Sequence, residues 1–254
     1  YMPNNAIAVA VGDFDSAEML AKIKAIYGAL PAGAAPQLFA RPEPDQNGER
    51  RVRVERPGRG VFLDVSYHVP AANDPDWFKL EILNSILSGA DSMGGGGIDN
   101  KTSRLYKALV ETEIAAGVDG GLTPTVDPFL YSINITLREG REPEEAEAAL
   151  YHEIDRLHAG DVTERELARA KKQARALFAY STERITTQAF WLAFAESFDS
   201  YDWFENYLAR LEAVTLADVQ EVAQKYLRPQ NRVVGTFVPL EGGDDEDYDE
   251  EESE

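Results

Sequence analysis

The chain has 254 residues, of which 44% are hydrophobic and 28% are charged, an ordinary composition for a globular protein. A chain of this length can bury roughly 70 to 75% of its unfolded surface, enough for one large domain or two small ones. The net charge of −20 disfavours nucleic acid as a partner, and the absence of cysteine excludes disulfides, thiolate metal sites and a cysteine nucleophile.

The start of the chain predicts one strand, one helix and a linker. The apolar run AIAVAV at residues 6–11 is typical of a buried strand. Asp15 and Glu18 have the spacing of a capping box before a helical pattern that continues to about residue 30. Residues 31–49 contain four prolines and little periodicity, which indicates a linker.

The middle of the chain predicts four strands and two helices. Alternating and β-branched residues indicate strands in RRVRVERP and GVFLDVSYHVP, and further strands in AAGVDGGLT and PFLYSINITLREG. Asp74 and Pro75 supply the N-cap and the first position of the helix DWFKLEILNSILSG. A second helix is expected over residues 102–113, after a glycine run.

The remainder is almost entirely helical. Thr163 and Glu166 form a capping box at the head of a stretch reaching about Phe198, and the pattern leaves open a break near Ser181. Shorter helices follow, and the last, over residues 215–227, leads directly into a closing strand. The three tryptophans lie at helical spacings that suit a core or a domain interface: Trp77, Trp191 and Trp203.

The last 14 residues, EGGDDEDYDEEESE, hold ten acidic side chains and no basic one, which is half of the net charge. Such a run repels itself and cannot bury apolar surface, so it predicts a disordered, solvating tail. An acidic docking arm or a cation sink is the alternative.

Strands joined partly by hairpins and partly by helices favour an α+β fold, with a mixed, mainly antiparallel sheet packed against helices. The two ends of the sequence also share a pattern, in which a tyrosine, a proline and an asparagine precede an apolar run. At the start the pattern comprises Tyr1, Pro3, Asn5 and residues 6–11, and near the end Tyr226, Pro229, Asn231 and residues 233–238.

Four stretches in this order carry a resemblance: YMPNNAIAVAVGDFD, SRLYKALVETEIAAGV, VTERELARAKKQ and VTLADVQEVAQKYLRPQNR. They resemble the pitrilysin and insulinase superfamily of zinc metallopeptidases, which includes the mitochondrial processing peptidases. The resemblance extends to about Pro239 and implies the second, non-catalytic α/β unit of such an enzyme. It also implies that the zinc motif His-x-x-Glu-His precedes the tyrosine, proline and asparagine landmark, with which this chain begins.

The resemblance and the composition together divide the chain into four parts. Residues 1–30 correspond to the final strand and helix of a catalytic-type unit, and residues 31–49 to a linker. Residues 50–240 correspond to the complete second unit, and residues 241–254 form the acidic tail.

The three histidines do not supply a zinc motif. No pair among His68, His152 and His158 has the i, i+4 spacing that places two imidazoles on one helical face. His152 and His158 would lie roughly 120° apart around a helix, so they cannot hold one tetrahedral zinc ion from one face. We therefore expect no metal or cofactor in this chain, whereas the resemblance implies zinc for the parent enzyme.

The resemblance also implies candidate substrate contacts. In some members a glycine-rich loop at this place has been linked to substrate entry, and here it would comprise Gly94, Gly95, Gly96 and Gly97. Arg104 and Tyr106 follow it. The plainer interpretations are a flexible loop for the glycines and packing or capping for Arg104 and Tyr106. The Arg and Tyr that hold substrate in active partner halves correspond here to Val110 and Gly117, so this unit is not expected to supply that tyrosine.

We interpret the chain as the non-catalytic C-terminal domain of a zinc metalloendopeptidase, inactive alone, which packs on the zinc domain and forms part of the peptide-binding chamber. A zinc-free partner or assembly subunit of the same superfamily is the alternative. The expected partners are a zinc-bearing domain or subunit and a peptide, with homo- and hetero-oligomers both open. No window approaches the roughly 18 consecutive apolar residues of a membrane helix, so we expect no membrane span.

Overall fold

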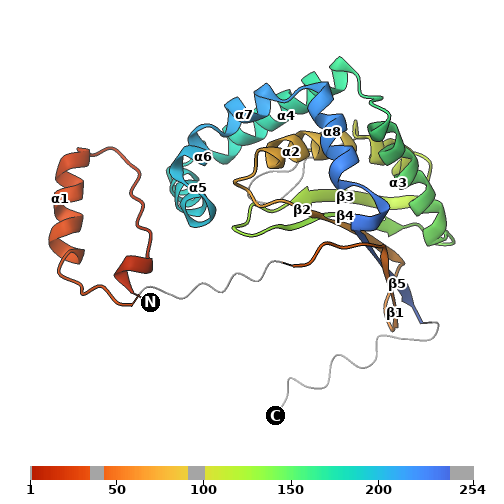
Figure 1. Ribbon diagram of the computed structural model, residues 1–254, viewed down its shortest axis with the longest axis horizontal. Coiled ribbons are helices and arrows are strands. Elements are labelled where there is room, and N and C mark those ends of the chain that lie inside the picture. Colours follow the sequence, from red (N-terminus) through yellow and green to blue (C-terminus); the bar gives the residue numbers. More distant parts are fainter. Residues whose placement is uncertain (1, 35–42, 91–100, 241–254) are drawn as a thin grey trace, which may run out of the picture.

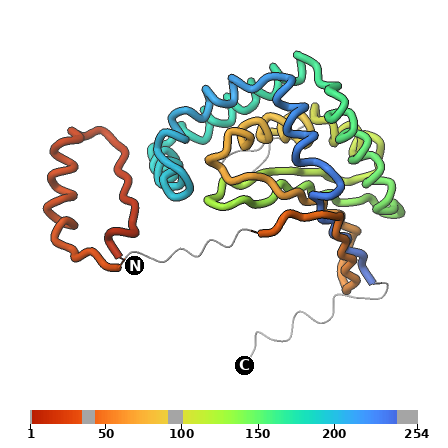
Figure 2. Tube along the Cα trace, in the orientation of Figure 1, coloured from red at the N-terminus to blue at the C-terminus, as the bar shows by residue number. Residues whose placement is uncertain are grey.

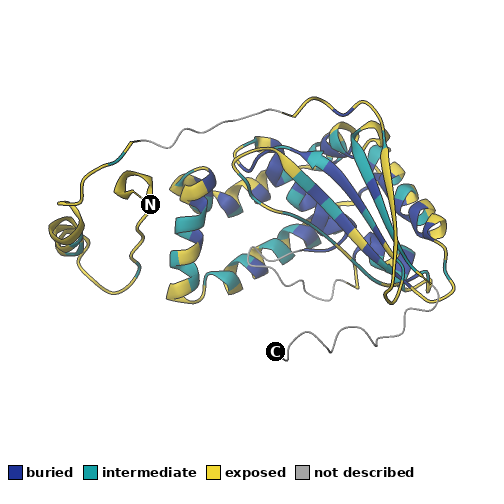
Figure 3. Cartoon of the chain, turned by 90° about the horizontal axis from the view of Figure 1, so that it is seen from below, coloured by how far each residue is buried: buried dark blue, intermediate teal, exposed yellow. Residues whose placement is uncertain are grey.

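The computed structural model of the protein describes residues 2–34, 43–90 and 101–240. From residue 43 onward these residues form a body in which helices cover one face of a sheet (Figure 1). Residues 2–34 lie apart from this body in all three whole-chain views (Figures 1, 2 and 3). The glycines Gly94 to Gly97 and the acidic tail are outside the described residues.

Within residues 43–90 and 101–240 the sheet has five strands in the order β1-β5-β2-β4-β3. β1 and β5 pair in parallel, and the other three pairs of these strands are antiparallel. This confirms the predicted α+β fold with a mixed, mainly antiparallel sheet. The strands are β1 Arg50–Arg56, β2 Phe62–Val69, β3 Ala115–Leu122, β4 Phe129–Leu137 and β5 Arg232–Pro239.

Two layers of helices lie over one face of the sheet (Figures 1 and 2). In the first layer α2 contacts β3, α3 contacts β4 and α8 contacts β2, while α4 and α7 pack on α2 from above. The helices of the body are α2 Pro75–Leu87, α3 Pro143–His158, α4 Glu164–Ser181, α5 Ile185–Phe198, α6 Tyr201–Glu205, α7 Tyr207–Ala213 and α8 Leu216–Tyr226.

The core lies between the sheet and these helices. Side chains alternate along a strand, and the odd-numbered positions of β2 and β4, apart from the exposed Phe129 at the start of β4, point into the core, as Val65 and Ile133 do with no exposed surface. The even-numbered positions lie on the opposite face, where Phe62 and Asn134 are exposed. Figure 3 shows this alternation of buried and exposed residues along the strands. One face of the sheet is therefore free of helices among the described residues.

An aromatic cluster joins the two helical layers. The ring centroids of Trp77 and Trp203 are 5.2 Å apart, and Phe78 and Tyr207 pack against both. Trp203 Nε1 donates to the carbonyl of Ala72 at 2.8 Å, so the buried indole has a partner. Of the core and domain-interface positions expected for the tryptophans, Trp77 and Trp203 occupy the core.

The strand predicted at residues 6–11 is wrong. Residues 2–34 contain a short 3₁₀ turn, η1 Pro3–Asn5, and one helix, α1 Ser16–Tyr27, and none of their side chains is buried. No described strand pairs with residues 6–11, and a strand exists only where a neighbour accepts and donates its backbone hydrogen bonds. The helix prediction is confirmed, with Asp15 Oδ1 accepting from Glu18 N at 2.8 Å.

One other helix prediction needs correction, and one open question is answered. Within residues 102–113 the helix is shorter than predicted: residues 104–105 are α-helical and lead into a five-residue π-helix, η2 Tyr106–Val110, which turns follow. The long helical stretch is divided into α4 and α5 at residues 182–184, where Thr182 Oγ1 donates to the Phe178 carbonyl at 2.8 Å. This hydroxyl takes a carbonyl of the last turn of α4, which favours a helix end over continuation.

Candidate functional site

A buried polar cluster holds the end of α2 against strand β4, before the glycine run in the sequence. Tyr131 Oη lies 3.0 Å from Asn84 Oδ1, to which it donates, and 3.1 Å from Ser88 Oγ. Burial raises the pKa of Tyr131 despite the hydrogen bond to Ser88, so its phenol stays neutral at physiological pH. The cluster therefore fixes one end of the segment that contains the candidate glycines.

Gly120 on the edge strand β3 permits this close approach. A Cβ atom at this position would lie 2.4 Å from Ser88 Oγ and 2.8 Å from Ser88 Cβ. Only glycine allows helix α2 and strand β3 to approach so closely here. Sequence reasoning did not single out Gly120, Asn84 or Ser88, because the contact joins segments far apart in the chain.

Arg104, a candidate substrate contact, is 5% exposed and lies among acidic groups from α3 and α4. Its Nε donates to Glu166 Oε1 at 2.8 Å, and its Nη2 donates to Glu166 Oε2 and to the carbonyl of Asp161. Its Nη1 has no hydrogen-bond partner among the described residues and lies 3.8 Å from Glu153 Oε2.

Glu166 connects Arg104 to the start of α4. Its Oε2 accepts from Thr163 N at 2.9 Å and from Thr163 Oγ1 at 2.8 Å, which completes the capping box. Burial alone would raise the pKa of Glu166, but hydrogen bonds from Arg104 and Thr163 outweigh it and hold the pKa at about 2. Arg104 therefore stabilises the N-terminal cap of α4. Contact between Arg104 and a substrate stays a prediction.

Tyr106 begins the π-helix and is partly exposed, so its side chain can be reached from solvent. Its backbone N–H donates to Ser103 Oγ at 3.3 Å. Glu113, three residues after the end of the π-helix, has a positive φ of 60°, which is unusual for a residue with a side chain. π-helices and strained backbone both concentrate at functional sites, so this segment is the best-placed of the candidates.

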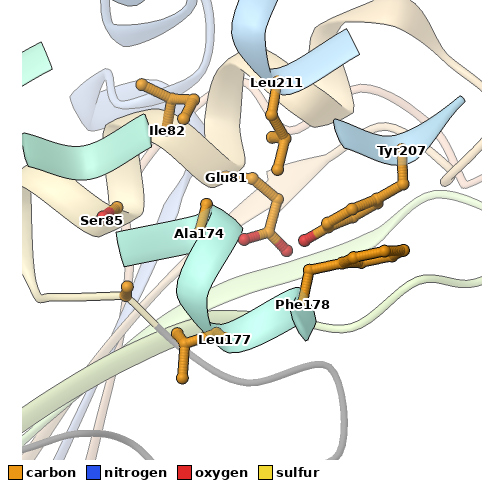
Figure 4. A pocket seen from close by; sticks show the side chains of 9 residues that line it. Glu81, Ile82, Ser85, Ala174, Leu177, Phe178, Tyr207 and Leu211 are labelled. Carbon is orange, nitrogen blue, oxygen red and sulfur yellow. The ribbon is translucent and has the colours of Figure 1, made fainter. Parts of the chain in front are cut away.

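A small cavity lies under the aromatic cluster, between α2, α4 and α7 (Figure 4). It offers about 10 Å³, roughly the space of one water molecule. Glu81 and Tyr207 point their oxygen atoms toward one another there, and Ser85 Oγ is buried with no partner among the described residues. The cavity is too small for a substrate and suits one bound water.

The open face of the sheet offers a broader polar surface. Ser66 Oγ donates to Asp64 Oδ1 at 2.7 Å and lies 2.8 Å from Ser132 Oγ. Asn134 Nδ2 donates to Asp119 Oδ2 at 3.2 Å on the neighbouring strands. A shallow depression of about 310 Å³ lies beside them, with Phe62 and Phe237 in its wall. Such a surface combines hydrogen-bonding groups with apolar contact, as peptide binding requires.

The described residues do not fit a zinc ion. They contain no group of three or more histidine, aspartate or glutamate side chains placed to hold a metal. His68 Nε2 lies 3.7 Å from Glu43, and His158 Nε2 lies 3.1 Å from the carbonyl of Ala223. His152 is exposed on α3.

Comparison with family models identifies the protein family of this chain. Residues 1–174 match the family described as the peptidase M16 inactive domain. The chain belongs to the M16 peptidase family. The match confirms the resemblance to the pitrilysin and insulinase superfamily and identifies the non-catalytic kind of domain. A comparison with curated proteins gave no match.

Solved structures of proteases have the same fold. A protease from Helicobacter pylori is 20% identical, with a TM-score of 0.79 over 90% of this chain and 54% of its own. A proposed zinc protease from Bordetella pertussis is 28% identical, with a TM-score of 0.62 over 71% of this chain and 93% of its own. The inactive peptidase domain of a proposed zinc protease from Bordetella parapertussis is 27% identical, with a TM-score of 0.62 over 73% and 96%.

This M16 chain spans about half the length of the Helicobacter protein. None of its described helices is both long enough and apolar enough to cross a bilayer.

Proposed function

We propose that this chain is the non-catalytic domain of a zinc metallopeptidase, which packs on the zinc-bearing domain and forms part of the wall of its peptide-binding chamber. The parent enzyme hydrolyses peptide bonds with a zinc-activated water. The M16 inactive-domain match supports this proposal, together with the lack of a zinc-fitting side-chain group among the described residues.

The exposed apolar side of helix α1 supports the proposal that this segment packs on another domain. At 100° per residue the apolar side chains of α1 fall on one arc of the helix surface. None is buried, and Leu20, Ile26 and Tyr27 are 50%, 67% and 60% exposed. A soluble protein seldom leaves such an arc facing water, so we assign residues 2–34 to a neighbouring M16 unit.

The chamber wall is assigned to the open face of the sheet. This face has polar groups and two exposed aromatic rings, and no described helix covers it. The partly exposed Tyr106 and the glycines before it are proposed as further substrate contacts, as the resemblance implies.

The direct test compares the complete product of the gene with residues 1–254. We expect the complete product to bind about one zinc ion and to cleave unfolded peptides, and residues 1–254 to do neither. Chelator-sensitive peptidase activity that stays with residues 1–254 through re-purification would contradict the proposal. A complete product without zinc or activity would instead favour the alternative, a zinc-free partner or assembly subunit.

The packing of α1 has its own test. In the complete product, Leu20→Asp and Ile26→Asp are expected to lower stability by about 2–4 kcal/mol each, because they bury a charge in the interface. In residues 1–254 the same changes should leave stability within about 0.5 kcal/mol. The matched control is Ala25→Asp, on the opposite side of α1, which should be tolerated in both proteins.

A further inference from the structure

The depression on the open face of the sheet is centred on one glycine. Strand pairing sets Gly235 of β5 directly opposite Asp64 of β2. Phe237, two residues further along β5, lies on the same face and pairs with Phe62 of β2 and Val54 of β1. These side chains stand around a position that has none, and the space of about 310 Å³ lies there.

The fold does not require glycine at this position. Gly235 has a φ outside the left-handed region, so a residue with a side chain could adopt its backbone conformation. A Cβ atom there would meet Asp64 Cβ at 3.9 Å, an ordinary van der Waals contact. Glycine inside a strand weakens the strand and often marks the close approach of a ligand. Gly235 therefore indicates a place on this face that is kept open for a ligand.

The wall of the depression is apolar on one side. The ring centroids of Phe62 and Phe237 are 5.9 Å apart, with an angle of 49° between the ring planes. Phe62 and Val54 are 44% and 38% exposed, so a ligand can reach this wall. The methylene stem of a lysine or arginine packs on such a surface, and an aromatic ring also attracts the charge that the stem carries.

Asp64 is the one charged side chain in the lining of the depression. Its Oδ1 accepts from Ser66 Oγ at 2.7 Å, and Ser66 Oγ lies 2.8 Å from Ser132 Oγ, so the carboxylate is held in position. Asp64 has no ion pair with a described lysine or arginine, and no described donor reaches its Oδ2. A carboxylate with one oxygen available beside an apolar wall suits a cationic group.

We propose that the depression binds a lysine or arginine side chain of a peptide, with the stem along Phe62 and Phe237 and the charged head on Asp64 Oδ2. The inference rests on the proposed function, which assigns this face to the wall of a peptide-binding chamber, and it adds the class of substrate. Asp64 is then a specificity-determining residue, because it favours a basic side chain over an uncharged one of the same length.

Two peptides that differ in one charge test the site in residues 1–254. The probes are acetyl-Ala-Ala-Lys-Ala-Ala-amide and the same peptide with norleucine in place of lysine, which keeps the stem and lacks the ammonium group. In NMR titrations the lysine peptide should shift the backbone amides of Asp64 and Gly235 and bind about fivefold more tightly than the norleucine peptide. Equal affinities, or shifts that leave both amides unchanged, would overturn the proposal.

Matched variants separate the site from the general attraction of an acidic chain. Asp64→Asn keeps the shape of the side chain and should weaken binding of the lysine peptide about fivefold, with no change for the norleucine peptide. Gly235→Leu fills the depression and should abolish binding of both peptides at these amides, without lowering the thermal stability of the chain. Asp202→Asn removes an exposed carboxylate on α6 and is the control. Equal losses in Asp64→Asn and Asp202→Asn would contradict a specific role for Asp64.

The complete product of the gene distinguishes failure of the site from failure of the proposed function. In unfolded peptides that carry either one lysine or one norleucine, Asp64→Asn should lower kcat/KM about fivefold for the lysine peptide alone. If the complete product is inactive while residues 1–254 bind the lysine peptide at Asp64, the proposed function fails and the binding site stands. An active product whose preference for lysine does not depend on Asp64 would overturn the assignment of this site to the substrate.

Discussion

One sequence pattern occurs twice in this molecule, in different surroundings. Residues Pro3–Asn5 and Pro229–Asn231 both form a 3₁₀ turn. In the first turn the backbone N–H of Ala6 donates to the Pro3 carbonyl, and in the second that of Arg232 donates to the Pro229 carbonyl. Beyond the second turn the chain enters β5, between β1 and β2, whereas beyond the first it meets no described strand. The turn is therefore set by local sequence, while the strand depends on its neighbours.

The side chains of the two patterns differ in the same way. Asn231 Nδ2 donates to the carbonyls of His68 and Tyr226, both at 2.8 Å, and so ties its turn to β2 and α8. In the first turn it is Asn4, the neighbour of the matching Asn5, that exchanges hydrogen bonds with the backbone of Gly33, within the same exposed segment. Only the second pattern contributes to the core.

The largest expected effect comes from the paired positions Val234 and Ile7, which are 1% and 48% exposed. Val234→Asp should destabilise the chain by about 4 kcal/mol or more, since it buries an unpaired carboxylate between two strands. Ile7→Asp should change the free energy of unfolding by less than about 0.5 kcal/mol. If Val234→Asp does not fold, Val234→Ala should still lower the free energy of unfolding by about 2 kcal/mol in urea titrations. Equal effects of substitutions at Val234 and Ile7 would contradict the difference between the two patterns.

The buried ion pairs of the body provide the next test. Arg104→Met keeps the length of the side chain but leaves Glu166 without its cation, while Glu153 keeps its ion pair with Arg156, and should cost about 3 kcal/mol. Arg165→Met, one residue before Glu166 but exposed, should cost under about 0.5 kcal/mol. Similar losses in thermal unfolding for the two variants would show that the network adds nothing specific.

The pH dependence of stability should report on Asp76, which joins α2 to α8. Its Oδ2 accepts from Lys225 at 2.6 Å and from Tyr226 at 3.0 Å, and Lys79 lies 2.9 Å from its Oδ1. Burial would raise the pKa of Asp76, but these hydrogen bonds prevail and lower it from 3.8 to about 2.

Because the folded pKa is lower than the unfolded one, Asp76 stabilises the fold above about pH 4 and loses this effect as the pH falls through about 2. Asp76→Asn should cost about 1–2 kcal/mol at pH 7 and flatten the stability curve between pH 4 and 2. Asp202→Asn, exposed on α6, is the control at pH 7. A curve of unchanged slope for Asp76→Asn would contradict this assignment.

The smallest effect separates two helix caps. Thr163→Ala at the head of α4 should lower the free energy of unfolding by about 1 kcal/mol. Asp15→Ala removes an equivalent cap from α1, but α1 buries no residue, so only its own helicity should fall. Global unfolding in urea should therefore detect the first variant alone, and residue-level hydrogen exchange should detect both.

Much of the fold could be predicted because its signals are local. The caps at Asp74, Thr163 and Thr215 lie where the helices begin, and the alternation in residues 129–137 gives the strand and its buried face. The sequence could not show that residues 6–11 form no strand, because their apolar run is as strong as that of residues 233–238, which do form one. What differs is the presence of a neighbouring strand, which no single segment encodes.

The candidate site was less predictable. Arg104 was singled out as a landmark, but its bonds to Glu166 and Asp161 join residues about 60 positions apart. Neither the cluster of Asn84, Ser88 and Tyr131 nor the close approach at Gly120 follows a spacing rule. The glycines in AAGVDGGL were the one available signal, since glycine within a strand often marks a close contact.

The parallel pairing of β1 with β5 has a mechanical consequence. Seven residue pairs join the first strand of the body to the last, running in the same direction from Arg50 and Val233 to Arg56 and Pro239. A pulling force applied at residues 50 and 239 would act along these strands and load their hydrogen bonds together, in shear. Separation one bond at a time requires a force across the strands, so the body is built to resist tension along the direction of its own chain.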